Sequence, residues 1–170
     1  MIYRLIALDL DGTLLNSQLE IREDSIAAIR QADALGIKVL IVTGRHHTAA
    51  RYYWHQLGIN TPAICCNGAY VYDFCEDVLL PGGSPLTKAQ AHEVLRLSKA
   101  LNIPSLVYTT EHINYESGGF DKFYLLDWAK TLPVALRPEI RAVDSLINEI
   151  EQAPTVWKLI SFNDDPVLLD

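Results

Sequence analysis

The sequence predicts an α/β protein in which a Rossmann-like parallel sheet is followed by a smaller α+β module. Within the first 68 residues, three short apolar runs alternate with two segments of helical periodicity. Each apolar run ends in small or polar residues. Because right-handed crossovers join such β-α-β-α-β units, we expect the three runs to form one parallel sheet with the helices packed on it.

The first strand is expected over residues 4–8. This run is short and almost continuously apolar, and polar residues and Gly12 follow it, which is typical of a strand buried on both faces. The next segment has the spacing of an amphipathic helix and ends at Gly36. Its apolar positions are Ile26, Ile29, Ala32 and Leu35.

The second and third strands are expected over residues 37–42 and 63–66, which are again short apolar runs. Between them, the pattern predicts a helix from about His46 to Leu57 that Gly58 closes. The sheet therefore has its polar strand ends at three places along the chain. In open α/β sheets, ligands bind at the carboxyl ends of the strands.

The chain changes character after residue 68. Residues 70–72 and 78–80 are expected to pair as a hairpin, and the Pro- and Gly-rich segment 81–85 is expected to be a hinge. We therefore predict a core domain over 1–81, and over 82–170 a partial α+β domain. In the second domain, helices are expected over 87–101, 120–131 and 145–150, and strands over 105–110, 113–116, 140–143 and 156–162.

The net charge bounds the possible partners. The formal charge of −7 disfavours nucleic acid, because an acidic surface repels a phosphate backbone. It also repels small phosphates, so a phosphate site would need a local positive field from a metal ion or from aligned backbone N–H groups.

Three cysteines, Cys65, Cys66 and Cys75, include no CxxC pair, and two of them lie in an apolar run. We expect reduced, mostly buried thiols, as in a cytosolic protein. The N-terminus lacks a signal-peptide pattern, and no apolar run approaches the length that spans a membrane. A cytoplasmic protein with no membrane partner is expected.

The segment from Asp9 to Thr13 follows the first strand and has the residues of a phosphoester-cleaving loop. Such chemistry needs a nucleophilic carboxylate, a second carboxyl group as acid and base, and a cation that screens both. Asp9 and Asp11 supply the pair. The backbone N–H of Leu10 is available to a phosphoryl oxygen, Gly12 permits a sharp turn, and Thr13 braces the loop. The alternative, a polar turn that caps a strand, leaves two acids without a partner.

The ends of the other two strands extend this hypothesis. At the second, the hydroxyl of Thr43 and the N–H of Gly44 are placed to hold a phosphoryl group, and Arg45 is either a substrate anchor or a brace for the loop. At the third, Asn67 with Gly68 forms a turn beside the site, although Asn-Gly is also a common turn without function.

Together, Asp9-Leu10-Asp11-Gly12-Thr13, Thr43-Gly44-Arg45 and Asn67-Gly68 resemble the motifs of the haloacid dehalogenase (HAD) superfamily. The closer resemblance is to its Cof-type branch, whose α/β (type IIB-like) cap follows the third core strand. Residues 41–47, 61–68 and 156–158 are similar to the pyridoxal phosphatases of enterobacteria.

The resemblance implies a magnesium-dependent phosphomonoester hydrolase that works through an aspartyl-phosphate. It makes Asp9 the nucleophile and a magnesium ligand, and Asp11 the acid/base, with its backbone carbonyl on magnesium. Leu10, Thr43 and Gly44 would contact phosphate. The implied substrates are pyridoxal 5′-phosphate or sugar phosphates, which are small-molecule phosphate esters.

The chain also departs from the family pattern. The family's later lysine and its Gly-Asp metal motif are not matched, and Asp164-Asp165-Pro166 is typical of a helix start, so we expect a chain cut within the cap. One alternative is therefore an inactive fragment, which could self-associate through the unpaired edge of the first strand. Another is a receiver-like phosphoacceptor, against which the acid/base Asp11 argues.

The remaining conspicuous side chains have simpler interpretations. His46 and His47 are expected at the surface, where the second helix starts. The three tryptophans, Trp54, Trp128 and Trp157, are expected to pack in the interior.

Overall fold

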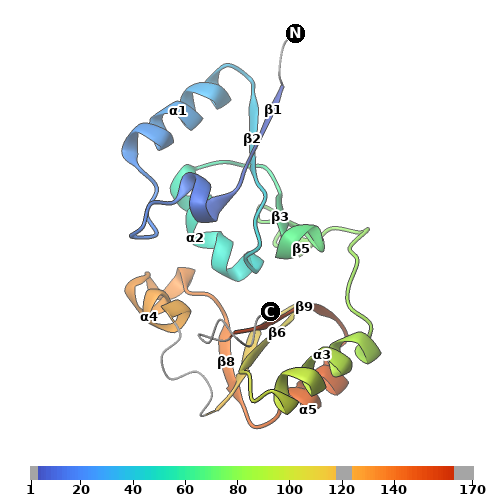
Figure 1. The fold of residues 1–170 in the computed structure, drawn as a ribbon. Helices are drawn as coiled ribbons and strands as arrows, with labels where there is room; N and C mark the ends of the chain where they lie inside the picture. The colour runs from blue at the N-terminus through green and yellow to red at the C-terminus, as the bar shows by residue number, and fades with distance from the viewer. Residues whose placement is uncertain (1–3, 118–123, 163–170) are drawn as a thin grey trace. The chain divides into compact units, whose positions relative to one another are not determined.

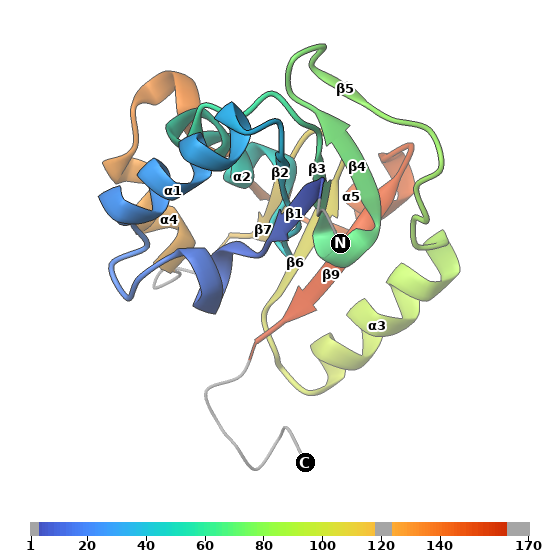
Figure 2. The ribbon, with the colours of Figure 1, turned by 90° about the horizontal axis from the view of Figure 1, so that it is seen from above.

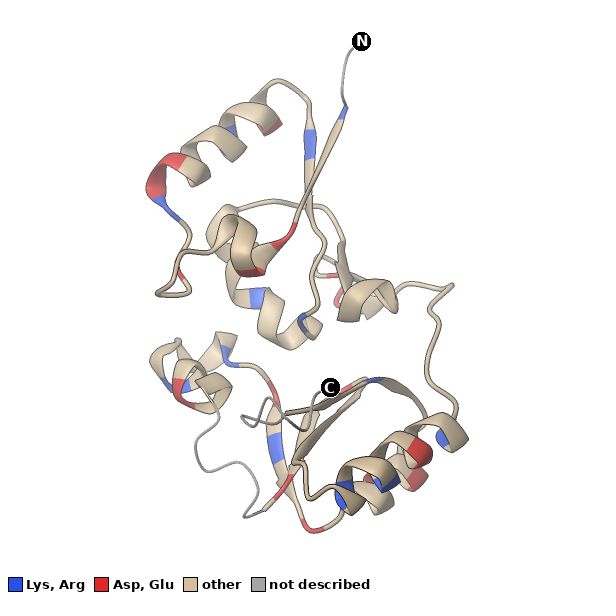
Figure 3. Cartoon of the chain, viewed as in Figure 1, with Lys and Arg blue, Asp and Glu red and all other residues tan. Residues whose placement is uncertain are grey.

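The computed structural model describes residues 4–117 and 124–162 (Figure 1). The chain divides into two compact units, Met1–Gly83 and Ser84–Asp170, and no sheet of the described residues spans both. In Figure 3, Lys and Arg are interspersed with Asp and Glu in both units. Within the described ranges, no helix is long and apolar enough to cross a membrane.

The first unit contains the predicted parallel strands. β1 (Leu5–Leu8) pairs in parallel with β2 (Lys38–Ile41), with Leu5 opposite Lys38 and Leu8 opposite Ile41. β3 (Ala63–Cys65) continues the order through a parallel bridge between Val42 and Ile64. The α/β class predicted from the sequence is confirmed, although β3 joins β2 through this one bridge instead of a full ladder.

Two helices connect these strands. α1 (Glu23–Ala34) follows β1, and α2 (His47–Leu57) follows β2. The helices contact one another and lie on the same side of β1 and β2 (Figure 2). Gly58 ends α2 in the left-handed conformation, with φ of 66°. The buried apolar side chains of these elements are Ile26, Ile29, Val39, Ile41, Ala49, Ala50, Tyr53 and Leu57.

The expectation that the first strand is buried on both faces is wrong for the described chain. Leu5 is 53% exposed and Ile6 is 36% exposed. α1 packs against β2 and α2 packs against β3, whereas β1 stands at the end of the strand order. Among the described residues β2 is the one strand paired with β1, so too few neighbours surround β1 to bury its apolar side chains.

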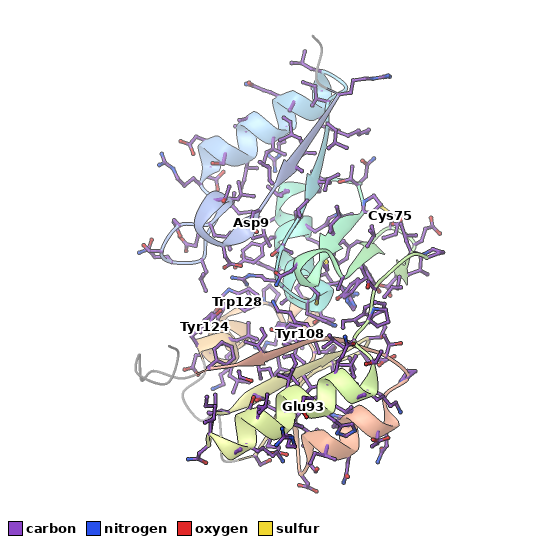
Figure 4. The ribbon with its side chains drawn as sticks, turned by 45° about the vertical axis from the view of Figure 1, so that its right-hand side comes forward. Asp9, Cys75, Glu93, Tyr108, Tyr124 and Trp128 are labelled. Atoms are coloured by element: carbon purple, nitrogen blue, oxygen red, sulfur yellow. The ribbon has the colours of Figure 1, made fainter. Side chains whose placement is uncertain are left out.

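The predicted hairpin follows β3. β4 (Tyr70–Asp73) pairs antiparallel with both β3 and β5 (Val78–Leu79). Cys65 and Cys66 are buried, as expected, whereas Cys75 is exposed in the turn of the hairpin (Figure 4).

The second unit is a four-stranded sheet with strand order β8-β7-β6-β9. Its strands are β6 (Ser105–Thr109), β7 (Ile113–Glu116), β8 (Ile140–Val143) and β9 (Val156–Ser161). The β7–β8 pair is parallel, and the other two pairs are antiparallel. The predicted strands are therefore present, with ends that differ by a residue at most.

The helices of this unit are α3 (Lys88–Ala100), α4 (Tyr124–Thr131) and α5 (Leu146–Gln152). Thr87 starts α3 with a capping box to Gln90. α3 and α5 lie side by side against the sheet (Figure 1). Their core comprises Ala91, Leu95, Val107, Val143, Leu146, Ile150 and Val156. The predicted start of the 120–131 helix and the predicted helix start at Asp164 lie outside the described residues.

Candidate active site

The loop after β1 forms a wide turn that presents two carboxylates. Figure 4 shows Asp9 where β1 ends. The N–H of Leu14 donates to the carbonyl of Asp9 at 3.3 Å, and the N–H of Leu15 donates to the carbonyl of Leu10 at 2.9 Å. Leu10 is fully buried, whereas Asp9 and Asp11 are exposed. The apolar side chain therefore anchors the loop while the two acids face outward.

Gly12 makes the reversal between the two halves of this loop possible. Asp11 has φ −74° and ψ 124°, and Gly12 has φ 74° and ψ 1°. These are the angles of the two central residues of a type II turn, whose second position requires a positive φ. A side chain at Gly12 would be strained even though no atom lies within 4 Å of where its Cβ would stand.

Asp9 and Asp11 have different partners. The Oδ1 of Asp9 accepts the N–H of Leu10 at 2.8 Å, so the amide that we expected to contact phosphate is bonded to the Asp9 carboxylate in this structure. The carboxylate of Asp11 accepts two hydrogen bonds from Arg45, one from Nε at 2.7 Å and one from a terminal guanidinium nitrogen at 2.6 Å.

The side chain of Arg45 packs against the core of the first unit. Its side chain is 9% exposed, and its guanidinium carbon lies 5.1 Å from the ring centre of Tyr53. Burial raises the pKa of Tyr53 to about 12, so the ring stays neutral beneath the cation. A two-pronged hydrogen-bonded pair fixes both the position and the plane of a carboxylate. Arg45 thus fixes the carboxylate of Asp11 in the loop after β1.

Thr43 connects the second strand end to the third. Its N–H donates to the carbonyl of Ile64 at 2.9 Å, and its carbonyl accepts the N–H of Asn67 at 3.1 Å. The N–H of Cys66 donates to the carbonyl of Arg45 at 3.0 Å. Thr43 is 2% exposed, and its hydroxyl accepts the N–H of Arg45 at 3.1 Å. The three strand ends are therefore joined by direct bonds.

The third strand end has an unusual backbone. Cys66, Asn67 and Gly68 have φ values of 51°, 60° and 91°. Asn and Gly tolerate the left-handed region, but Cys66 rarely adopts it. Asn67 and Gly68 are exposed. Of the other predicted site residues, Gly44 follows β2 and Thr13 lies in the loop after β1. A strained turn of this kind persists only where neighbouring structure holds it.

The expectation that His46 and His47 lie at the surface is wrong. His46 is fully buried and caps α2 by accepting the N–H of Thr48. His47 is 5% exposed and contacts two tyrosines. Its ring is stacked on that of Tyr72, with 3.8 Å between the ring centres, and its Nδ1 lies 2.9 Å from the hydroxyl oxygen of Tyr70. The hairpin covers the start of α2, which the local sequence pattern does not reveal.

Sequence reasoning missed Tyr53 and Tyr70 as neighbours of the site. Both are buried polar aromatics whose hydroxyls have partners, Leu19 for Tyr53 and His47 for Tyr70. No local pattern marks these two tyrosines, because their partners lie 23 and 34 positions away in the sequence.

The donor atoms at the site are suited to magnesium. Asp9 and Asp11 offer carboxylate oxygens, and Asp11 also offers its backbone carbonyl. Magnesium prefers oxygen ligands and commonly takes only one or two protein carboxylates, with water and substrate phosphate in its other positions. In the described ranges, no three His, Cys, Asp or Glu side chains gather as a metal site.

The chain is similar to known phosphatases. A family model described as haloacid dehalogenase-like hydrolase matches residues 6–168. The chain is 37% identical over 165 residues to pyridoxal phosphate phosphatase YbhA of Escherichia coli, covering 97% of this chain and 60% of that protein. It is 35% identical over 116 residues to phosphatase YwpJ of Bacillus subtilis, covering 68% of this chain and 40% of that protein.

A solved structure shares this fold. It is a haloacid dehalogenase-like hydrolase from B. subtilis, which is 27% identical to this chain with a TM-score of 0.78. The match covers 98% of this chain and 64% of that protein's chain. The chain thus spans less than two thirds of the length of each of these two curated relatives.

Proposed function

Because the chain belongs to the family of haloacid dehalogenase-like hydrolases, we propose that it carries the nucleophile side of a magnesium-dependent phosphomonoester hydrolase. The observation that carries this proposal is the link between Asp11 and Thr43 through Arg45 at the carboxyl ends of β1 and β2, with Asp9 two residues before Asp11 in the same loop.

The reaction proceeds in two steps. In the first, a carboxylate oxygen of Asp9 attacks phosphorus, and the bond between phosphorus and the ester oxygen breaks as Asp11 gives that oxygen a proton. In the second, water attacks the aspartyl-phosphate, Asp11 takes a proton from the water, and the bond between phosphorus and Asp9 breaks. Inorganic phosphate leaves, and both carboxyl groups return to their starting states.

The residues around Asp9 hold the transferring group. We assign the hydroxyl of Thr43 and the N–H groups of Gly44 and Leu10 as hydrogen-bond donors to the oxygens of the phosphoryl group. Such donors stabilise the negative charge that develops there. Leu10 would exchange its bond to the Asp9 carboxylate for one to phosphate. Arg45 sets the orientation of Asp11 through their two hydrogen bonds.

Magnesium would be held by Asp9 and by Asp11 through its carbonyl, and it supplies the positive charge that lets an anionic ester approach two carboxylates. This matters here because the chain carries a net charge of −7. Gly12, Thr13 and Asn67 shape the loops on either side and have no assigned chemical step.

The substrate is a small-molecule phosphate ester, with pyridoxal 5′-phosphate as the first candidate and sugar phosphates as the second. The support is the 37% identity to a protein named pyridoxal phosphate phosphatase. The working compartment that we propose is the cytoplasm.

The experiment is an assay of phosphate release from pyridoxal 5′-phosphate with and without added magnesium. Asp9→Asn is expected to abolish release. Asp33→Asn is the matched control, because Asp33 is an exposed acid at the far end of α1, where it pairs with Lys38 at 3.7 Å. Release that survives Asp9→Asn would refute the nucleophile assignment. An absence of release from the unaltered chain would contradict the proposed hydrolase.

A further inference from the structure

The hydroxyl of Tyr70 is a junction between two segments of the site. Tyr70 lies on β4 and is 1% exposed. Its oxygen accepts the backbone N–H of His47 at 3.1 Å and lies 2.9 Å from the Nδ1 of the same residue. The thiol of Cys66 donates to it at 3.7 Å. One buried oxygen thus contacts the first residue of α2 and the first residue of the left-handed turn.

The protons in this junction can be assigned. A tyrosine hydroxyl has one proton to donate and two lone pairs to accept with. A backbone N–H and the Cys66 thiol both donate to this oxygen. The 2.9 Å contact between the Tyr70 oxygen and Nδ1 of His47 then fits a Tyr70 O–H that donates to Nδ1, with the ring neutral and its proton on Nε2.

Burial supports a neutral His47. Desolvation, together with the charges of His46 and Arg51, lowers the pKa of His47 to about 2. Desolvation also raises the pKa of Tyr70, so the hydroxyl keeps the proton that it donates. The His47 ring is stacked on Tyr72 with an interplanar angle of 12°, which fixes the direction of Nδ1.

The two joined segments are those that carry the strand ends. His47 follows Arg45 by two residues at the start of α2. Cys66 donates its N–H to the carbonyl of Arg45, and Asn67 donates its N–H to the carbonyl of Thr43. A shift at the Tyr70 hydroxyl is therefore transmitted to the backbone of Thr43–Arg45 from both sides.

We propose that Tyr70 is a positioning residue, whose hydroxyl sets the backbone of Thr43–Arg45 through His47 and Cys66. The inference deepens the proposed function and rests on it for one consequence, which is that this backbone binds the transferring phosphoryl group. Tyr70 itself is assigned no contact with substrate.

The test compares Tyr70→Phe with Tyr72→Phe in the full 170-residue chain. Both changes remove one hydroxyl from β4, and both tyrosines contact the His47 ring. The Tyr72 hydroxyl, however, donates to Asp77 at 2.9 Å, in the hairpin turn and outside the junction. Thermal unfolding checks that both variants are folded.

The first readout needs no activity. Amide NMR shifts of Thr43, Gly44 and Arg45 are expected to move in Tyr70→Phe and to stay in place in Tyr72→Phe, and the His47 amide is expected to exchange faster only in Tyr70→Phe. Imidazole nitrogen shifts are expected to show the Nε2–H form of His47 in the unaltered chain. Unmoved shifts at Thr43–Arg45, or equal movement in both variants, would overturn the proposal.

The second readout is titration with inorganic phosphate in the presence of magnesium. Tyr70→Phe is expected to raise the dissociation constant about tenfold, as for one lost charge-assisted bond, and Tyr72→Phe is expected to leave it within twofold. If the unaltered chain binds no phosphate, the proposed function is in doubt, while the amide shifts still decide the role of Tyr70. Equal phosphate affinity in both variants would refute the link to phosphate binding. If Tyr70→Phe does not fold, Cys66→Ala replaces it and must move the same amides.

Discussion

Arg45 and Asp11 form a two-pronged ion pair across 34 positions of sequence, with nitrogen–oxygen distances of 2.7 and 2.6 Å. The arginine side chain is 9% exposed and the aspartate side chain is 49% exposed, so the cation is fixed and the acid projects from it. Arg45, which follows β2, thus fixes Asp11 in the loop after β1.

Arg45→Lys tests this pair. Lysine keeps the charge but loses the planar fork, so Asp11 is expected to lose its fixed plane. We expect kcat/KM to fall about tenfold, equivalent to about 1.4 kcal/mol of transition-state stabilisation. Arg51→Lys is the matched control, because Arg51 lies on α2 and pairs with Asp77 at 2.8 Å. An equal fall in both variants would contradict a specific role for Arg45.

Thr43→Val tests the hydroxyl at the second strand end. Valine has nearly the same shape but cannot accept the N–H of Arg45 or donate to a phosphoryl oxygen. Loss of one such donor commonly lowers kcat by about 10²-fold. Steady-state kinetics should show this fall in Thr43→Val, whereas Thr43→Ser, which keeps the hydroxyl, should stay within about tenfold of the unaltered chain. Comparable rates for valine and serine would exclude a role for the hydroxyl.

Gly12→Ala tests the turn in the loop after β1. At φ 74° a Cβ is strained, so we expect a loss of about 1–2 kcal/mol of stability, measured by urea unfolding. Gly12→Asn is the comparison, because asparagine tolerates positive φ better and should lose less. If alanine and asparagine are equally tolerated, backbone conformation does not explain the glycine.

His47 predicts a pH dependence of stability. Its pKa is about 2 in the folded chain and 6.5 in the unfolded reference, so below pH 6.5 the unfolded chain binds more protons than the folded one. The free energy of unfolding therefore falls as pH decreases from 6.5 towards 2, by up to about 1.4 kcal/mol per pH unit from this group.

The measurement is urea unfolding of the unaltered chain and of His47→Gln at pH 7, 6 and 5. Glutamine has no proton to gain, so the pH dependence should be flatter in His47→Gln. His55→Gln is the control for the substitution itself, because His55 is an exposed histidine on the same helix. Parallel curves for the unaltered chain and His47→Gln would count against the buried neutral ring.

The burial of Ile150 predicts a large contribution of the second unit's core to the free energy of unfolding. Ile150 is fully buried on α5, whereas Ile147 on the same helix is 42% exposed. Ile150→Ala is expected to lower the free energy of unfolding by about 2–5 kcal/mol, through lost burial and the remaining cavity. Ile147→Ala should change it by less than about 1 kcal/mol. Calorimetry of both variants provides the comparison, and similar values would contradict the assigned core.

The helices and strands could be predicted because their signals are local. The spacing of Ile26 and Ile29 and the glycines at 36 and 58 determine where α1 and α2 form and end. The three polar strand ends were visible for the same reason, since each directly follows an apolar run.

The other features depend on contacts between distant segments. His47 is buried because Tyr70 and Tyr72 cover it from a hairpin more than twenty residues later, which no periodicity at the start of α2 reveals. Leu5 and Ile6 look like core residues, but their burial depends on how many layers surround β1. The pairing of Arg45 with Asp11 likewise required the fold.

The three cysteines differ in accessibility, so one of them can be labelled selectively. Burial raises the pKa of the Cys65 thiol, and Cys66 is enclosed beside Tyr70, so neither offers a thiolate to a reagent in solution. Cys75 is exposed in the hairpin turn (Figure 4). A maleimide dye at neutral pH should therefore attach at one place on the folded chain, and a fluorescence probe can be introduced without first mutating any cysteine. Attachment of two further dyes would then report unfolding of the first unit.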